Sequence, residues 1–129
     1  MALRNPYDSY NKTKQNSIFT ASKEELTMML YNGMVKFVNQ AIIAIDEKRI
    51  QQAHEAIYRT SDIIMELNMT LNMEYELSKG LRQLYDFLID KLTEANITKD
   101  KRALEEILPI VIDLRDTWKE AMVLSKKEQ

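Results

Sequence analysis

His54 is the only histidine among the 129 residues, so any imidazole chemistry of this chain depends on it. A serine hydrolase places its nucleophile in a glycine-containing elbow, and no serine here lies in that pattern. Di-iron sites in helical bundles use Glu-x-x-His pairs on two helices, but Gln51 stands three residues before His54. Zinc proteases use His-Glu-x-x-His, and Tyr58 occupies the second histidine position. We therefore interpret His54 as a solvated or helix-flanking histidine and expect no metal site.

Phosphotransfer domains offer one further use for a surface histidine on the second helix of a four-helix bundle. Their motif is similar to His-x-x-Lys-Gly, in which the lysine neutralises phosphate and the glycine gives access to the imidazole. In this chain Ile57 and Tyr58 occupy those two positions. Histidine phosphotransfer is therefore kept only as an alternative hypothesis.

Other catalytic patterns are missing from the sequence. The chain has no cysteine, which excludes thiolate catalysis and a disulfide framework. No glycine-rich phosphate loop is present, and nothing places two carboxylates together in an apolar pocket. The carboxylates are spaced as on solvated helix faces, as are Glu24, Glu25, Glu105, Glu106, Asp113 and Asp116. We expect neither an enzyme nor a cofactor.

Composition limits the classes of partner and the cellular compartment that we expect for this chain. The 18 basic and 20 acidic side chains nearly cancel, which argues against nucleic acid as the main ligand. The stretch from Met1 to Lys12 has no apolar core of signal-peptide length. No segment reaches the length expected of a membrane span, so we expect no membrane insertion. These features favour a cytoplasmic protein.

The hydrophobic periodicity predicts an all-α fold, an antiparallel four-helix bundle that follows an irregular N-terminal segment. We expect a flexible segment over residues 1–21 and the bundle over 22–125, with helices at about 23–47, 50–71, 74–96 and 99–124. Ser22, Asn72 and Thr98 are the expected caps. Pro109 should kink the last helix without breaking it, because the apolar period continues past it. Short connections favour antiparallel neighbours, although crossover connectivity stays open.

The first helix carries more apolar surface than a bundle core requires. Leu26, Leu30, Gly33, Phe37, Ala41 and Ala44 form one stripe. Flanking apolar residues widen this stripe to roughly 220°, although a width of about 100° is enough to face a core. In the other helices the expected core residues are Ile50, Ala53, Ile57, Ile64, Leu67 and Leu71, then Leu77, Leu81, Leu84, Leu88, Leu92 and Ala95, then Ala103, Ile107, Ile110, Val111, Leu114, Trp118 and Ala121.

A central position in the bundle, a second copy of the chain or a partner polypeptide could cover the surplus. Seven internal methionines favour a partner, because methionine is common on surfaces that accept varied helices. The candidate partner-binding residues lie outside the expected core stripes. They are Met28, Tyr31, Val35, Val38 and Ile42 on the first helix, Tyr58, Met65 and Met69 on the second, and Leu108 and Ile112 on the fourth.

The sequence resembles the flagellin-specific export chaperone family (FliS) over nearly its whole length. The most specific matches are Asn5-Pro6-Tyr7-Asp8-Ser9-Tyr10 and the block from Thr20 to Gly33, TASKEELTMMLYNG. Ala53-His54-Glu55-Ala56, Ile63-Ile64-Met65-Glu66-Leu67-Asn68, Leu84-Tyr85-Asp86-Phe87 and Leu114-Arg115-Asp116-Thr117-Trp118 are also similar to family sequences. Lys23, where proline is common in the family, and Pro109 depart from its pattern.

This resemblance implies a cytoplasmic chaperone that binds the disordered C-terminal segment of flagellin in apolar grooves. Binding would prevent premature polymerisation and keep the subunit competent for type III secretion, without a nucleotide. The N-terminal segment with Tyr7 and Tyr10 is implied to cover part of the bundle and to shift when flagellin binds. The flagellar export gate is a further expected partner. A homodimer of the empty chaperone, or a self-associating structural bundle, stays an alternative.

Overall fold

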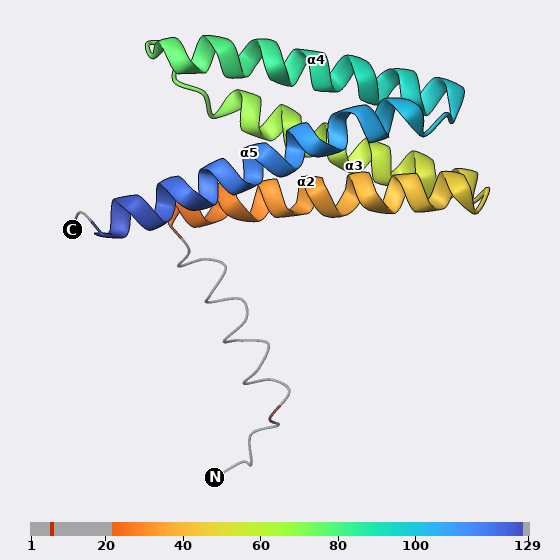
Figure 1. The fold of residues 1–129 in the computed structure, drawn as a ribbon, viewed down its shortest axis with the longest axis horizontal. Coiled ribbons are helices and arrows are strands. Elements are labelled where there is room, and N and C mark those ends of the chain that lie inside the picture. The colour runs from red at the N-terminus through yellow and green to blue at the C-terminus, as the bar shows by residue number, and fades with distance from the viewer. Residues whose placement is uncertain (1–5, 7–21, 128–129) are drawn as a thin grey trace.

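A computed structural model describes Pro6 and residues 22–127, and Tyr7 and Tyr10 lie outside this range. The described chain forms four long helices, α2 (Lys23–Asp46), α3 (Ile50–Met69), α4 (Glu76–Thr98) and α5 (Arg102–Lys127). Successive helices run in opposite directions (Figure 1). The largest difference from the expected bounds is at α5, which begins and ends three residues later than predicted from the sequence.

The four helices form a closed ring. α2 packs against α3 and α5, and α4 packs against the same two helices, so that α2 and α4 are diagonal to one another. Each helix therefore contacts the next one in the chain, and the last helix returns to the first. This is the up-and-down antiparallel bundle expected from the short connections.

Of the three predicted caps, only Ser22 acts as expected, and α3 and α4 begin without a side-chain cap. Ser22 caps α2 as predicted, because its hydroxyl accepts from the Glu25 amide at 3.1 Å. Asn72 instead orders the α3–α4 connection by accepting from the Glu74 amide at 3.0 Å. Thr98 bridges the end of α4 to the next connection, donating to the Glu94 carbonyl and accepting from the Asp100 amide.

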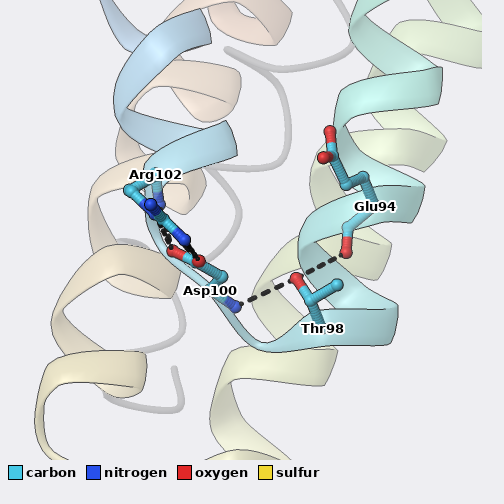
Figure 2. A network of polar contacts seen from close by, with 4 residues as sticks. All are labelled: Glu94, Thr98, Asp100 and Arg102. Atoms are coloured by element: carbon cyan, nitrogen blue, oxygen red, sulfur yellow. Dashed lines mark hydrogen bonds and ion pairs between the residues drawn. The ribbon is translucent and has the colours of Figure 1, made fainter.

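Asp100, and not the predicted Thr98, accepts from the backbone amide of the first residue of α5. Its carboxylate accepts from the Arg102 amide at 3.0 Å and from the Arg102 guanidinium at 2.6 Å (Figure 2). The Arg102 side chain holds the pKa of Asp100 at about 2 by hydrogen bonding to its ionised form. The carboxylate also lies at the positive end of the helix dipole, which favours its charge.

Pro109 lies within α5, which continues on both sides of it. Proline lacks the amide that would bond to the carbonyl four residues earlier. Both Pro109 and Glu105 are exposed, so water can reach the carbonyl that loses its helical donor. This position explains why the proline does not end the helix.

The core follows the predicted stripes along most of α3, α4 and α5. Its largest fully buried side chains are Tyr85, Met34, Ile57, Ile64, Leu88, Leu92, Leu104, Ile107, Val38 and Val111. Three expected core residues of these helices, Ile50, Leu77 and Ala121, are exposed. Ile50 and Leu77 lie in first turns, and Ala121 lies near the end of α5. Helix ends have fewer neighbouring turns to cover them.

The orientation of α2 differs from the prediction. The expected core residue Leu26 is exposed, whereas Tyr31, Val35 and Val38 are buried at 5%, 7% and 0% exposure. The middle of the wide apolar arc faces the core, and the edges of the arc lie beside α3 and α5. Part of the surplus is thus explained by close packing on both sides. On the α3 side, a Cβ added to Gly33 would lie only 3.1 Å from Ile63 Cδ1.

By length and composition, α2 is apolar enough to cross a membrane, contrary to the sequence-based expectation. Its six buried residues include Met34, Ala41 and Ala44, and they pack into the bundle core. A third of the most apolar part of α2 is therefore used within the bundle.

Candidate binding surface

Four of the predicted partner-binding residues lie on α2 and α5, and their helical spacing places them on the side where these two helices meet. Met28 and Ile42 lie on α2, separated by two seven-residue steps that keep side chains on one helix face. Leu108 and Ile112 lie seven and three residues before Arg115, which faces the same seam. All four apolar side chains are half-buried. They form a shallow apolar surface that the bundle covers only in part.

Polar contacts hold the two ends of this seam. Lys101 of α5 pairs with Asp46 of α2 at 2.7 Å. At the other end, the Trp118 indole donates to the Glu24 carbonyl at 3.0 Å. These contacts fix the spacing of α2 and α5, so the seam between them is a preformed surface.

The seam opens into a hollow of about 500 Å³ beside the start of α2. Met28 and Asn32 form one wall. The opposite wall comes from α5 and carries Arg115, Asp116, Lys119, Met122, Val123 and Lys126. The hollow therefore combines apolar side chains with basic ones.

A second apolar surface runs along the outer side of α3. Tyr58, Met65 and Met69 are 60%, 57% and 80% exposed. Their spacing of seven and four residues places them on one helical stripe, as the sequence analysis proposed. We call this the outer α3 stripe. α3 and α5 are diagonal in the ring, so this stripe lies across the bundle from the outer side of α5.

Three of the predicted partner-binding residues do not form an open surface. Tyr31, Val35 and Val38 belong to the core. They were assigned to a second face because the hydrophobic pattern marks the width of an arc and not its centre. In this structure they can support a binding surface only from beneath.

An aromatic cleft at one end of the bundle was not anticipated. Tyr31 of α2, Tyr85 of α4 and Trp118 of α5 line it together with residues of the α3–α4 connection, around about 370 Å³. The Tyr31 and Tyr85 hydroxyls are 2.7 Å apart, and the Tyr31 and Trp118 ring centroids are 6.3 Å apart. The sequence placed Trp118 on the expected core stripe of its helix and Tyr31 in the wide apolar arc, but it gave no sign that Tyr85 would join them.

Burial raises the pKa of both tyrosines in this cleft, because a phenolate would place a charge in the core. Their hydrogen bond raises the pKa of Tyr85 further and offsets part of the shift at Tyr31. Both hydroxyls are neutral at physiological pH. They act as a polar contact between two diagonal helices and not as an acid or base.

His54 is exposed on α3 and makes a structural contact. Its Nδ1 lies 3.1 Å from Asn96 Oδ1 on α4, and that oxygen also accepts from Lys99 Nζ at 2.7 Å. An amide oxygen is only an acceptor, so Nδ1 carries the proton in this contact. The interaction fits the helix-flanking histidine expected from the sequence. Within residues 22–127 no cluster of histidine and acidic side chains has the geometry of a metal site.

Comparison with known proteins identifies the family. The family model described as "Flagellar protein FliS" matches residues 6–125. The chain belongs to the FliS family. It is 41% identical to the flagellar secretion chaperone FliS of Bacillus subtilis over 129 residues, which cover 100% of this chain and 95% of that protein.

Proteins of lower sequence identity agree with this assignment. The FliS of Campylobacter jejuni is 32% identical, with 87% of this chain and 89% of that protein covered. A solved flagellar chaperone from bacteria has the same fold, with a TM-score of 0.72 at 20% identity and coverage of 92% and 98%. The family is one of export chaperones, and its members are not enzymes. Membership argues against the phosphotransfer alternative for His54.

Proposed function

We propose that this FliS protein is a cytoplasmic export chaperone that binds the disordered C-terminal segment of flagellin in its apolar grooves. Binding would prevent premature polymerisation and keep flagellin competent for secretion. The observation that carries the proposal is the apolar surface left uncovered by a complete bundle. It comprises the α2–α5 seam and the outer α3 stripe, which lie on different sides of the molecule.

The placement of these two surfaces favours an extended partner. A rigid globular protein cannot contact both sides of the bundle at once, whereas a chain that folds on binding can pass around it. Each large apolar side chain contributes roughly 1.5–3 kcal/mol when fully buried. Several such contacts can exceed the estimated 4–15 kcal/mol cost of association and still allow release.

The outer α3 stripe provides the clearest test. Tyr58 and Met65 are exposed, so replacing both with aspartate should leave the bundle folded while removing two apolar anchors. We expect the flagellin C-terminal segment to bind the Tyr58→Asp/Met65→Asp variant at least about 100-fold more weakly in calorimetry. Wild-type binding should show a negative heat-capacity change.

Gln52→Asp/Gln83→Asp is the matched control, because both glutamines are exposed and the charge change is the same. This variant should bind like the wild type, and all three proteins should have the same helical circular dichroism. A wild-type protein that does not bind the flagellin segment would refute the proposed function. Equal binding by the stripe variant would remove the outer α3 stripe from the site.

The same uncovered residues favour self-association as a second candidate. An empty chaperone could pair its apolar surfaces with those of another copy. Light scattering over a dilution series, with and without the flagellin segment, separates the two. We expect any dimer to dissociate when flagellin is bound. A dimer that persists at saturating flagellin would favour the structural role.

Two further parts of the proposal come from the family. Tyr7 and Tyr10 are proposed to cover part of the binding surface until flagellin arrives. The export gate is proposed as the partner that receives the complex. Neither proposal depends on the described helices alone.

A further inference from the structure

The hollow at the end of the α2–α5 seam differs from the other apolar surfaces in its charge. Arg115, Lys119 and Lys126 are basic, and Asp116 is the one acidic residue of its lining. Asp116 is already engaged, because its Oδ1 lies 3.0 Å from both Nε and the terminal guanidinium nitrogen of Arg115. Within residues 22–127, Lys119 and Lys126 have no ion-pair partner.

The basic residues form a continuous line. Arg115, Lys119, Met122 and Lys126 follow one another at intervals of four, three and four residues, which places them on one face of α5. Met122 lies between Lys119 and Lys126 and faces Met28 across the hollow. An occupant would therefore meet an apolar floor with a cation on either side of Met122.

The role of Lys126 at the end of α5 does not explain this arrangement. A basic residue in the last turn complements the helix dipole, and Lys126 and Lys127 both do so. Lys119 lies two turns earlier, where the dipole has little effect. Its position on the hollow is thus a separate observation.

Charge also selects among the occupants that the chain could supply. Residues 1–21 precede the hollow in sequence, but they contain Arg4, Lys12 and Lys14 against the single acid Asp8. A basic segment does not complement a basic hollow. A second copy placed symmetrically on this hollow would bring like charges together.

We propose that this hollow binds an aspartate or glutamate side chain of the flagellin C-terminal segment, with neighbouring apolar residues of that segment on Met28 and Met122. This inference rests on the proposed function. The carboxylate would pair with Lys119 and Lys126 at the rim. Because rim charges act mainly on encounter, the pairing would speed association and fix which end of the segment lies beside α5.

The test reverses the charge of Lys119 and Lys126, the rim of the hollow, in what we call the rim variant. Lys119→Glu/Lys126→Glu is compared with Lys48→Glu/Lys79→Glu, which makes the same charge change at exposed lysines away from the hollow. Binding of the flagellin C-terminal segment is measured at about 50 mM and about 500 mM salt. We expect the rim variant to bind roughly tenfold more weakly at low salt, mostly through a slower association rate, and less than about threefold more weakly at high salt.

A second arm identifies the carboxylate. In a set of flagellin peptides, one acidic residue at a time is replaced by its amide. The peptide that lacks the contacting acid should bind the wild type more weakly than the unchanged peptide does. On the rim variant the two peptides should bind equally, as a double-mutant cycle requires. A peptide with the same acid replaced by lysine should bind the rim variant better than the wild type. Amidation of the peptide's terminal carboxylate should have no effect.

Each outcome decides the proposal. Equal binding by the rim and control variants would refute the acidic contact while leaving flagellin binding intact. An equal loss at both salt concentrations would show that the contact is not electrostatic. A loss that follows terminal amidation would assign the hollow to the chain end and refute the side-chain contact. If the wild type binds no flagellin peptide, the proposed function itself is refuted, and the acidic contact with it.

Discussion

Removing a hydroxyl from the Tyr31–Tyr85 pair should cost more than the hydrogen bond itself is worth. Each Tyr→Phe change deletes one partner of a buried 2.7 Å contact and leaves the other hydroxyl without it. A typical hydrogen bond contributes about 0.5–1.5 kcal/mol, whereas an unsatisfied buried group costs about 1–3 kcal/mol. We expect each single variant to lose about 1–2 kcal/mol of unfolding free energy.

The double variant separates the hydrogen bond from the cost of a hydroxyl left without a partner. Both tyrosines are buried, at 5% and 1% exposure, so either single change leaves a hydroxyl with little access to water. The double variant removes both hydroxyls and leaves neither without a partner. Its loss of unfolding free energy should therefore be at least about 1 kcal/mol smaller than the sum of the two single losses.

Urea denaturation followed by circular dichroism measures all four proteins, and unchanged slopes validate the comparison. Additive losses would refute the reasoning, because they would mean that each hydroxyl is satisfied independently. The pair also predicts a pH dependence. Burial raises the pKa of both tyrosines in the folded state. The stabilising contribution of the Tyr31–Tyr85 pair is therefore complete below about pH 10, the usual pKa of tyrosine. The contribution is lost as pH rises further, and the double phenylalanine variant should lack this dependence.

Other predictions concern the glycines and the start of α5. Gly80→Ala should stabilise the protein by about 0.5–1 kcal/mol in thermal unfolding, because helical glycine is unfavourable and no atom lies within 4 Å of an added Cβ. Gly33→Ala should stabilise less than Gly80→Ala or destabilise, because its Cβ would lie 3.1 Å from Ile63 Cδ1 and that side chain would have to shift; equal stabilisation by both would refute the close packing of α2 on α3. The contribution of ionised Asp100 to stability should be present above pH 3.8 and be lost as pH falls toward about 2. In an NMR titration, Arg102→Gln should raise the pKa of Asp100 toward 3.8, and an unchanged pKa would contradict the assigned pairing.

The sequence predicted the number, order and direction of the helices because these depend on local signals. Ser22 is followed by a long apolar period, and polar connections separate the later periods. The same local signals failed at the α4–α5 connection, where Thr98 and Asp100 could both cap a helix. Only the backbone path shows that Thr98 still belongs to α4.

The azimuth of α2 could not be predicted, because an arc of roughly 220° has no marked centre. Its orientation depends on where α3 and α5 lie, and this is information from distant parts of the chain. Val35 and Val38 were therefore assigned to a partner although they form the core. The outer α3 stripe was predictable because its arc is narrow and well separated from the core of α3.

Contacts between residues far apart in the chain could not be predicted from the sequence for a different reason. Tyr31 and Tyr85 are 54 positions apart, and no local pattern links their hydroxyls. The basic hollow likewise needs Met28 of α2 and Lys119 of α5 to meet. The sequence contains both lysines, but no local pattern places Lys119 beside Met28.

The ring order of the helices also affects when the protein can act during its own synthesis. The α2–α5 seam joins the first and last described helices, so it cannot form until α5 has emerged from the ribosome. The outer α3 stripe can form much earlier, because α3 needs only its neighbours in the chain. A nascent chain without α5 therefore cannot present both apolar surfaces together, and a client that needs both would bind only after all four helices have formed.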